Sequence, residues 1–298
     1  MNVKQLKYVF VLAEEGSFSR AADALGISQP SLSQYIKRVE KEVGMELFDR
    51  SGGEVRLTDA GRAYIEIGRK MQDLEHQLEE QMADLAAYRT GTLAVGISAH
   101  RAVALMPSVV KAFKVLYPGI CLQIVERRRQ DLLEAAEHGE FDLVITTLPV
   151  NETLFSAETV FVEENVVAVP EYVQLPAAAV TGRKFPVISV AVLNGLSFAM
   201  LNEDHLMQRE LDALVQNHDL HLEKTVECTS IEALVEMVRE GIGAGFIPAC
   251  LAKPGRGMNF YSIQEAVPRR EIVVMCRKEQ YLSKAALDLK QLIHDVLA

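Results

Sequence analysis

The sequence has few of the features that mark a membrane or secreted protein. No apolar run in its 298 residues approaches the length needed to span a bilayer. The first residues, MNVKQLKYVFVLAEEG, have the pattern of an amphipathic helix with acidic residues, which differs from that of a signal peptide. We therefore expect a cytoplasmic protein without a membrane partner.

Patterns of metal sites and disulfide frameworks are also missing. The four cysteines, Cys121, Cys228, Cys250 and Cys276, are widely separated and form no CxxC pair, and the seven histidines include no HExxH motif. Such spacings are the usual sequence signals of bound metals and of disulfides. We predict no metal, no cofactor, and buried reduced thiols.

Motifs of catalytic sites are absent as well. Ser98 and His100 could suggest a hydrolase, but residues two apart at a strand-to-helix turn seldom meet as nucleophile and base, and no GxSxG accompanies them. Gly241, Gly243 and Gly245 follow a predicted helix, whereas a phosphate-binding loop follows a strand. We predict that the protein is not an enzyme, and a hydrolase is the least favoured alternative.

Basic charge is scarce, because the net charge is −10 at pH 7 and nucleic-acid-binding modules are often basic. The acidity is uneven, however. Residues 1–58 carry eight basic and eight acidic side chains, residues 59–89 carry a net charge of −3, and the remainder carries −7. A neutral module whose basic residues lie on one face can still neutralise phosphates, and dimerisation doubles those contacts.

The sequence does contain signals for two short helices between Ser17 and Gly44. Ser17 can cap a helix of apolar residues at helical spacing, and Gly26 lies where the chain turns left-handed at the end of that helix. Ser28 offers a second N-cap, and Pro30 falls in the first turn, where its missing N–H costs little. The second helix is predicted to extend to Gly44.

The second predicted helix has an apolar face and a polar face. Leu32, Ile36, Val39 and Val43 form an apolar stripe that would pack on the rest of the domain. The polar face carries side chains that can pair with base edges and phosphates of duplex DNA, although an ordinary solvated face is the alternative. The predicted DNA-binding residues are Gln29, Pro30, Ser31, Ser33, Gln34, Lys37, Arg38 and, in the segment that follows, Arg50.

A β-hairpin is predicted between Leu47 and Thr58, around the turn signal Ser51-Gly52-Gly53. Two helices followed by a hairpin predict a winged helix-turn-helix. The motifs SFSRAA, SQPSLS, LF-x-R and LT-x-AG, at this spacing, resemble the LysR-type family of bacterial transcriptional regulators. The resemblance implies a regulator that reads an inverted repeat in promoter DNA under the control of a small-molecule effector.

A long helix is predicted from Thr58 to about Ala87, with apolar residues recurring at steps of three and four. Such a seam favours pairing with a second helix, whereas an amphipathic helix lying on its own domain is the alternative. The resemblance implies antiparallel pairing of these linker helices and a homodimer that assembles to a homotetramer. The predicted dimerisation residues are Ile67, Met71, Leu74 and Leu78.

Beyond residue 90 the sequence pattern changes to that of alternating strands and helices, which predicts an α/β architecture. Two similar halves are joined by two strands, near Phe161 to Val169 and near Val267 to Met275. This arrangement looks like the periplasmic-binding-protein-like effector domain of LysR-type proteins. The predicted fold class is therefore α/β, with an N-terminal all-α winged helix-turn-helix, a long linker helix and a two-lobed effector domain.

The predicted domain boundaries follow from these patterns. Residues 1–58 form the winged helix-turn-helix DNA-binding domain, residues 59–89 the linker and dimerisation helix, and residues 90–298 the effector-binding domain. Lobe I covers about 90–162 and 267–298, and lobe II covers about 163–266. A solute-binding protein without a DNA function is the alternative, but it leaves the first third of the chain unexplained.

Polar residues that follow strands are the candidate effector contacts, because ligands of such sheets bind at the carboxyl ends of strands. Each residue alone is also explained as a cap or turn residue. Ser98 and His100 precede a helix whose free N–H groups and dipole favour an anion, so we predict a small carboxylate or an inorganic oxyanion as the effector. Together with positions that the resemblance implies, the predicted effector-binding residues are Ser98, His100, Arg128, Thr146, Asn202, Thr229 and Phe246.

The resemblance also suggests an alternative for the cysteines. Some members of the family sense oxidants through a cysteine pair in the second lobe, which makes Cys228 and Cys250 candidates for such a pair. Their wide separation and the lack of any other redox motif favour reduced thiols instead.

Overall fold

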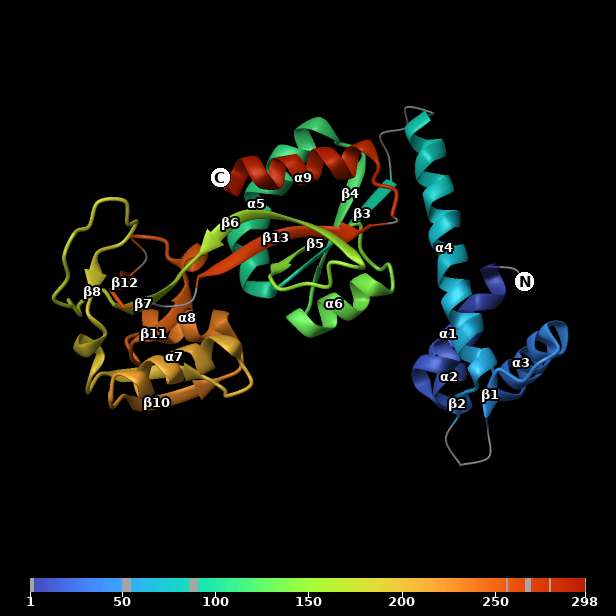
Figure 1. Ribbon diagram of the computed structural model, residues 1–298, viewed down its shortest axis with the longest axis horizontal. Helices are drawn as coiled ribbons and strands as arrows, with labels where there is room; N and C mark the ends of the chain where they lie inside the picture. The colour runs from blue at the N-terminus through green and yellow to red at the C-terminus, as the bar shows by residue number, and fades with distance from the viewer. Residues whose placement is uncertain are drawn as a thin grey trace. The chain divides into compact units, whose positions relative to one another are not determined.

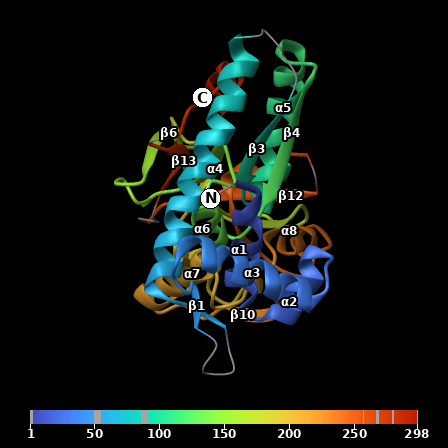
Figure 2. The ribbon, with the colours of Figure 1, turned by 90° about the vertical axis from the view of Figure 1, so that its right-hand side faces the viewer.

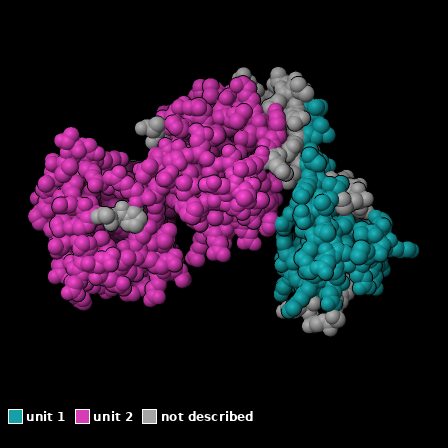
Figure 3. Space-filling view, in the orientation of Figure 1, with its two compact units in different colours: residues 1–88 teal, residues 89–298 magenta. Residues whose placement is uncertain are grey.

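The computed structural model describes residues 3–49, 55–85, 91–255, 257–265, 269–278 and 280–297. The chain divides into two compact units, residues 1–88 and residues 89–298, which Figure 3 shows in different colours. Each unit has its own buried apolar core, so each packs as a domain of its own.

Unit 1 consists of three helices, a hairpin and a long helix (Figure 1). Its elements are α1 (Val3–Glu15), α2 (Phe18–Leu25), α3 (Gln29–Val43), β1 (Phe48–Asp49), β2 (Arg56–Leu57) and α4 (Asp59–Leu85). β1 pairs antiparallel with β2. Apolar side chains from the three helices and the hairpin share one core, which includes Leu6, Val9, Ala21, Leu32, Ile36 and Leu47. The predicted winged helix-turn-helix is confirmed.

Gly26 and Gly44 end helices α2 and α3 at the positions predicted from the sequence. Gly26 follows α2 with φ 67° and Gly44 follows α3 with φ 79°, both in the left-handed region that glycine adopts without a steric penalty. The apolar stripe of α3 is shorter than predicted, because Val43 is 41% exposed while Leu32 and Ile36 are fully buried. Proximity to the helix end at Gly44 explains this, since no element of the described residues covers Val43 in the last turn.

The LT-x-AG motif joins the hairpin to α4. The Thr58 hydroxyl accepts a hydrogen bond from the Gly61 amide at 3.0 Å and donates one to the Glu46 carbonyl at 2.7 Å, so Thr58 caps α4 as predicted. A Cβ at Gly61 would collide with the Leu47 carbonyl oxygen. The glycine is therefore required for the close approach of α4 to the start of the hairpin.

Lobe I of unit 2 is a five-stranded sheet in the order β4-β3-β5-β13-β6. Its strands are β3 (Gly91–Ile97), β4 (Ile120–Glu126), β5 (Leu143–Thr147), β6 (Phe155–Glu163) and β13 (Arg270–Arg277), and its helices are α5 (Ala99–Leu116), α6 (Arg129–Glu137) and α9 (Lys284–Leu297). β3, β4 and β5 run parallel, and β13 runs antiparallel to β5 and β6. α5 and α9 cover one face of the sheet and α6 covers the other (Figure 1).

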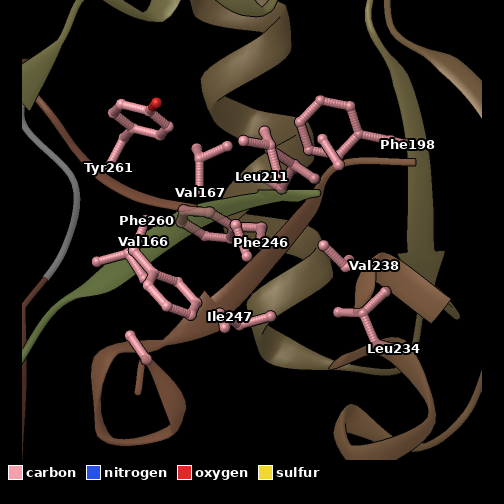
Figure 4. Packing of buried hydrophobic residues seen from close by; sticks show 14 of the residues in the cluster. Val166, Val167, Phe198, Leu211, Leu234, Val238, Phe246, Ile247, Phe260 and Tyr261 are labelled. Atoms are coloured by element: carbon pink, nitrogen blue, oxygen red, sulfur yellow. The ribbon is translucent and has the colours of Figure 1, made fainter. Parts of the chain in front are cut away.

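Lobe II contains a four-stranded sheet in the order β11-β7-β12-β8 and the parallel pair β9 and β10. Its elements are β7 (Asn165–Pro170), β8 (Val187–Ile188), η1 (Val190–Leu193), β9 (Ser197–Leu201), α7 (Leu206–Asn217), β10 (Glu223–Cys228), α8 (Ile231–Arg239), β11 (Gly245–Pro248), η2 (Ala249–Leu251) and β12 (Met258–Ile263). Side chains of β7, β11, β12, α7 and α8 interdigitate in one core (Figure 4).

The chain passes between the lobes twice. Glu164 separates β6 of lobe I from β7 of lobe II, and residues 264–269 separate β12 of lobe II from β13 of lobe I. The sequence analysis did not predict β8 and β12 as strands. α5 begins at Ala99, so His100, which was predicted to precede this helix, lies in its first turn, and Ser98 has the extended backbone of an N-cap residue.

Several predicted features lie outside the described residues. These are Arg50 and the hairpin turn at residues 51–53, the end of the linker helix at about residue 87, and the start of the second passage near Val267.

The cysteines are free thiols, but their burial differs from the prediction. Cys121 is exposed, so the prediction of a buried thiol is wrong at that position, which lies on the edge strand β4. Cys228, Cys250 and Cys276 are partly buried, and burial raises the pKa of each thiol above its usual value. Thiols with raised pKa values are poor nucleophiles at neutral pH.

Within the described residues, no helix combines the length and the apolar character needed to cross a membrane. No group of three or more His, Cys, Asp or Glu side chains in that part of the chain is arranged to hold a metal ion.

Candidate nucleic-acid interface and effector site

The outward face of α3 is the candidate nucleic-acid interface. Figure 2 shows α2 and α3 next to each other at the end of unit 1 that also carries the hairpin. Ser33 is half-buried, and the other predicted contacts of α3 are exposed, namely Gln29, Pro30, Ser31, Gln34, Lys37 and Arg38. The helix therefore presents a continuous polar face opposite the buried stripe of Leu32, Ile36 and Val39.

The first turn of α3 is held by short-range hydrogen bonds. The Ser28 hydroxyl accepts from the Ser31 amide at 3.4 Å and lies 2.7 Å from the Ser31 hydroxyl. Ser19 of α2 donates to the Gln29 side-chain oxygen at 3.4 Å, which joins the two helices across the turn. The first turn has no acidic residue, so its free N–H groups and the helix dipole favour a phosphate there.

Two side chains of α3 are available for a partner. Gln34 and Lys37 are exposed and have no hydrogen bond or ion pair within the described residues. The Arg38 guanidinium lies 4.6 Å from the centre of the Tyr35 ring, and the centre of that ring lies 4.2 Å from the centre of the Tyr8 ring, with the two planes tilted by 32°. These contacts fix the direction of Arg38 while leaving its charge at the surface.

Glu40 positions the hairpin, a role that the sequence reasoning missed. Its carboxylate accepts hydrogen bonds from the backbone amides of Leu47 at 3.0 Å and Phe48 at 3.2 Å, and the residue is buried. The available signal was its place four residues after Ile36, on the buried side of α3, where a carboxylate needs partners. Glu40 therefore fixes the position of the β1–β2 hairpin relative to α3.

The apolar residues that recur along one side of α4, which we call the α4 seam, are partly packed against unit 1 and partly exposed. Met71 packs against the core of unit 1, and a Cβ at Gly68 would meet Leu6 and Phe10, so α4 and α1 are in close contact there. Ile67, just before this contact, is exposed, and beyond it Leu74, Leu78 and Met82 are exposed within the described part of the chain. If α4 packed only on its own domain, the packing of Met71 would be explained, but the exposure of Leu74 and Leu78 would not.

In unit 2, the predicted effector contacts fall into two groups. Ser98 and Arg128 are the N-cap residues of α5 and α6, and neither uses its side chain as a cap. The Ser98 hydroxyl accepts a hydrogen bond from the Arg101 guanidinium at 3.3 Å and keeps its own proton to donate to a ligand. Asn202 and Thr229 follow β9 and β10, and the Asn202 amide donates to the Cys228 carbonyl at 3.0 Å. These four residues lie at strand ends, as predicted.

Of the other predicted contacts, Thr146 and Phe246 are buried within the sheets, and His100 lies in the first turn of α5. Thr146 lies in β5 opposite Val273, and Phe246 lies in β11 opposite Val167. Figure 4 shows Phe246 among the core side chains of lobe II, where it is 3% exposed. A role for Phe246 in binding therefore acts through the packing of lobe II, since its ring is covered by protein.

Four charged or titratable side chains from both lobes influence one another, and we call them the interlobe cluster: His100, Arg128, His205 and Arg270. Burial lowers the pKa of His100 well below its usual value, and the charges of Arg101, His205 and Arg270 lower it further. Burial also lowers the pKa of His205, with contributions from Arg270 and Arg128. Both imidazoles are therefore neutral at pH 7. Arg128 and Arg270 are the charged members of the cluster, and Arg270 is paired with Glu210 of α7.

His205 and Arg270 were not predicted. His205 is the N-cap of α7 and accepts a hydrogen bond from the Met207 amide at 3.4 Å through Nδ1. The Nε2 atom of His100 is buried and has no hydrogen-bond partner within the described residues. A ligand with an acceptor at this position would satisfy that atom.

Ion pairs hold the two passages between the lobes. Arg101 of α5 donates to Glu163 at the end of β6 at 2.8 Å, with side chains only 5% and 1% exposed. Glu210 of α7 accepts from Arg270 at 2.7 Å and from Asn165 at 2.8 Å, so one carboxylate of lobe II contacts the first residues of β7 and β13. These pairs fix the ends of the strands that join the lobes.

Comparison with known proteins agrees with this architecture. Residues 3–62 match the family model of the bacterial regulatory helix-turn-helix protein, lysR family, and residues 86–298 match that of the LysR substrate binding domain. A relative in Bacillus subtilis, the uncharacterized HTH-type transcriptional regulator YcgK, is 30% identical over 314 residues, which cover 100% of this chain and 95% of the relative.

Solved structures share the fold. Full-length OxyR from Pseudomonas aeruginosa superimposes with a TM-score of 0.62 at 23% identity, covering 100% of this chain and 97% of OxyR. Full-length CbnR in complex with its target DNA superimposes with a TM-score of 0.59 at 18% identity, covering 99% of this chain and 100% of CbnR. Since the two family models together match both the reading helices and the two-lobed unit, this chain belongs to the LysR family of bacterial transcriptional regulators.

Proposed function

We propose that the chain is a cytoplasmic, homo-oligomeric regulator that reads an inverted repeat in promoter DNA and responds to a small anion bound between its lobes. The exposed face of α3, with Gln34 and Lys37 unpaired in the described part of the chain, is the observation that carries the DNA part. The contacts with DNA are Gln29, Pro30, Ser31, Ser33, Gln34, Lys37, Arg38 and Arg50.

The exposed apolar residues of α4 support assembly through paired linker helices. Leu74 and Leu78 are exposed in the single chain and would be covered by a second copy of α4. The family resemblance favours an antiparallel dimer that assembles to a tetramer, which would place several reading helices on one stretch of DNA. No catalytic step belongs to this proposal.

The interlobe cluster supports an anionic effector. Arg128 supplies positive charge, Arg270 is paired with Glu210, and the two neutral imidazoles can supply donors or accept protons. Ser98 and the free N–H groups at the start of α5 add neutral donors. A small carboxylate or an inorganic oxyanion fits these groups, and the net charge of −10 acts against it only at long range, where salt screens it.

The DNA part is tested by comparing two substitutions on the same helix. Gln34→Ala should weaken binding to a selected operator by about 1 to 3 kcal/mol and leave non-specific DNA binding unchanged, because a base-edge contact carries the sequence preference. Lys37→Ala should weaken binding to both DNAs, because it removes a phosphate contact, and should reduce the salt dependence of binding. Fluorescence anisotropy with operator and scrambled duplexes measures both effects.

Glu75→Gln on α4, an exposed residue away from α3, is the matched control and should change neither binding constant. Operator preference that survives Gln34→Ala intact would contradict the assignment of the reading face.

The pH dependence of anion binding tests the interlobe cluster. An anion next to His100 and His205 favours their charged forms, so it raises pKa values that burial has lowered, and binding takes up protons. Anion affinity should therefore rise as the pH falls, and the rise should continue below the ordinary histidine pKa of about 6.5, because burial has lowered both pKa values in the free protein. Calorimetry with phosphate and with small carboxylates, in buffers of different ionisation enthalpy, measures the proton uptake.

Ser98→Ala should weaken anion binding in the same titrations, and His205→Asn should reduce the proton uptake. His138→Asn, at the C-terminal end of α6 in lobe I, is the matched control for a histidine outside the cluster. Heat from neutral or cationic ligands alone, with no response to anions, would rule out the anionic effector.

A further inference from the structure

A cavity lies at the junction of the lobes, and its lining contains no member of the interlobe cluster. Its volume is about 440 Å³, and it is lined by Leu105 and Val296 of lobe I, by residues 182–185 and Cys250 of lobe II, and by both passages between the lobes. None of the lining residues belongs to the interlobe cluster or to the predicted effector contacts. The volume falls in the range of small-molecule sites.

The carboxylates of this cavity are already neutralised by the protein. Glu163 is paired with the buried Arg101 at 2.8 Å. Glu164 accepts from Arg183 at 3.0 Å and from the Ser262 hydroxyl at 3.0 Å, which fastens the 182–185 segment to the passage between β6 and β7. A ligand in the cavity therefore does not have to neutralise either glutamate, and the polar wall is held in place without it.

Two cations of the cavity have no such partner. Lys184 and Arg269 are exposed, and no carboxylate in the described residues pairs with either. The Lys184 ammonium lies 5.4 Å from the centre of the Phe185 ring, so one of the cations borders the apolar wall directly. In a chain with a net charge of −10, two unpaired cations beside an apolar surface form a local positive site.

The remaining wall is apolar. Leu105 is 7% exposed and Phe185 is 5% exposed, and Phe161 and Val296 extend the apolar surface along β6 and α9. Contact with these side chains removes apolar surface of a ligand from water, which is the main source of affinity for such a site.

We propose that this cavity is a second ligand site for a small amphipathic organic acid. The carboxylate of the acid pairs with Lys184 and Arg269, and its hydrocarbon body packs against Leu105, Phe161 and Phe185. The occupant contacts both lobes, so it favours the interlobe arrangement in which the two walls meet. The Arg101–Glu163 pair connects the cavity to His100, so occupation of one site alters affinity at the other, and the coupling is reciprocal.

A single tryptophan reports on this cavity, because the chain has none of its own. The full-length Phe185→Trp variant places an indole in the wall, and Val296→Trp, at a position 38% exposed on the rim, is a second reporter that does not alter the core. Tyr172→Trp, at an exposed position of lobe II, is the matched control. The probes are isovalerate, hexanoate and phenylacetate, together with their neutral amides and with acetate.

At least one of the three acids should change the emission of both reporters in a saturable manner and leave the Tyr172→Trp control unchanged. Its amide and acetate should bind at least about tenfold more weakly, because each lacks one of the two recognised parts. The double variant Lys184→Gln/Arg269→Gln should also lose about tenfold or more in affinity, whereas Ser98→Ala should retain it.

The proposal is overturned if none of the three acids gives a saturable change in either reporter, or if acid and amide bind equally. It is also overturned if Ser98→Ala abolishes the signal and Lys184→Gln/Arg269→Gln does not, since the acid would then bind at the interlobe cluster. The DNA-binding and interlobe proposals are independent of these outcomes.

Discussion

Arg101→Leu is expected to lower the free energy of unfolding of the two-lobed unit by about 3 to 5 kcal/mol, the usual cost of removing one partner from a buried ion pair. The Glu163 carboxylate, 1% exposed and 2.8 Å from the guanidinium, would remain buried and charged without its partner. The urea midpoint of the full-length protein, followed by circular dichroism, measures this loss.

A surface pair in the same lobe provides the control. Arg127 and Glu140 lie 2.7 Å apart with side chains 37% and 44% exposed, so Arg127→Leu should cost no more than about 1 kcal/mol. The double variant Arg101→Leu/Glu163→Leu should recover much of the lost stability, because it leaves no isolated charge. Equal urea midpoints for Arg101→Leu and Arg127→Leu would show that the buried pair does not stabilise the lobe junction.

Leu74→Asp is expected to disrupt the oligomer. If the exposed seam of α4 pairs with a second copy, the new carboxylate becomes buried and unpaired in the interface, which costs several kcal/mol of association free energy. Sedimentation velocity at micromolar concentration should then show a shift to monomers. Gln72→Asp adds the same charge on nearly the opposite side of the helix and should leave the oligomer intact.

An unchanged sedimentation coefficient for Leu74→Asp would contradict pairing of α4 with a second copy and would favour the alternative, in which α4 lies only on its own domain. Circular dichroism of the same samples separates loss of assembly from loss of folding, because unit 1 buries its core without Leu74.

Local signals explain why so much of unit 1 was predictable. Caps and helix ends depend on residues within one turn, so Ser28, Gly26, Gly44 and Thr58 could be placed from the sequence alone. The exposure of Val43 could not be predicted in this way, because it depends on which other elements cover the last turn of α3.

Unit 2 was predictable in architecture but only partly in its site. Alternating strands and helices predict the sheet, and polar residues after strands predict Ser98 and Asn202 at strand ends. The contacts that shape the site join residues far apart in the chain, such as Arg101 with Glu163 and Glu210 with Arg270. No local pattern marks such pairs, because charged residues at those positions look like any solvated surface.

Phe246 shows the limit of reasoning from resemblance. The family pattern suggested an effector contact, while the structure places the ring in the core of lobe II. An aromatic residue in a short apolar strand is explained equally well by packing, and the strand pairing with β7 decides the direction of its side chain.

The central claim is that the chain reads DNA sequence through α3 and does so as a symmetric oligomer. In vitro selection from random duplexes with the full-length protein tests it most directly. We expect enrichment of an inverted repeat with half-sites separated by about one helical turn of DNA, or a multiple of it, and loss of that consensus in Gln34→Ala. Selection that enriches no sequence, or the same consensus from wild type and Gln34→Ala, would contradict it.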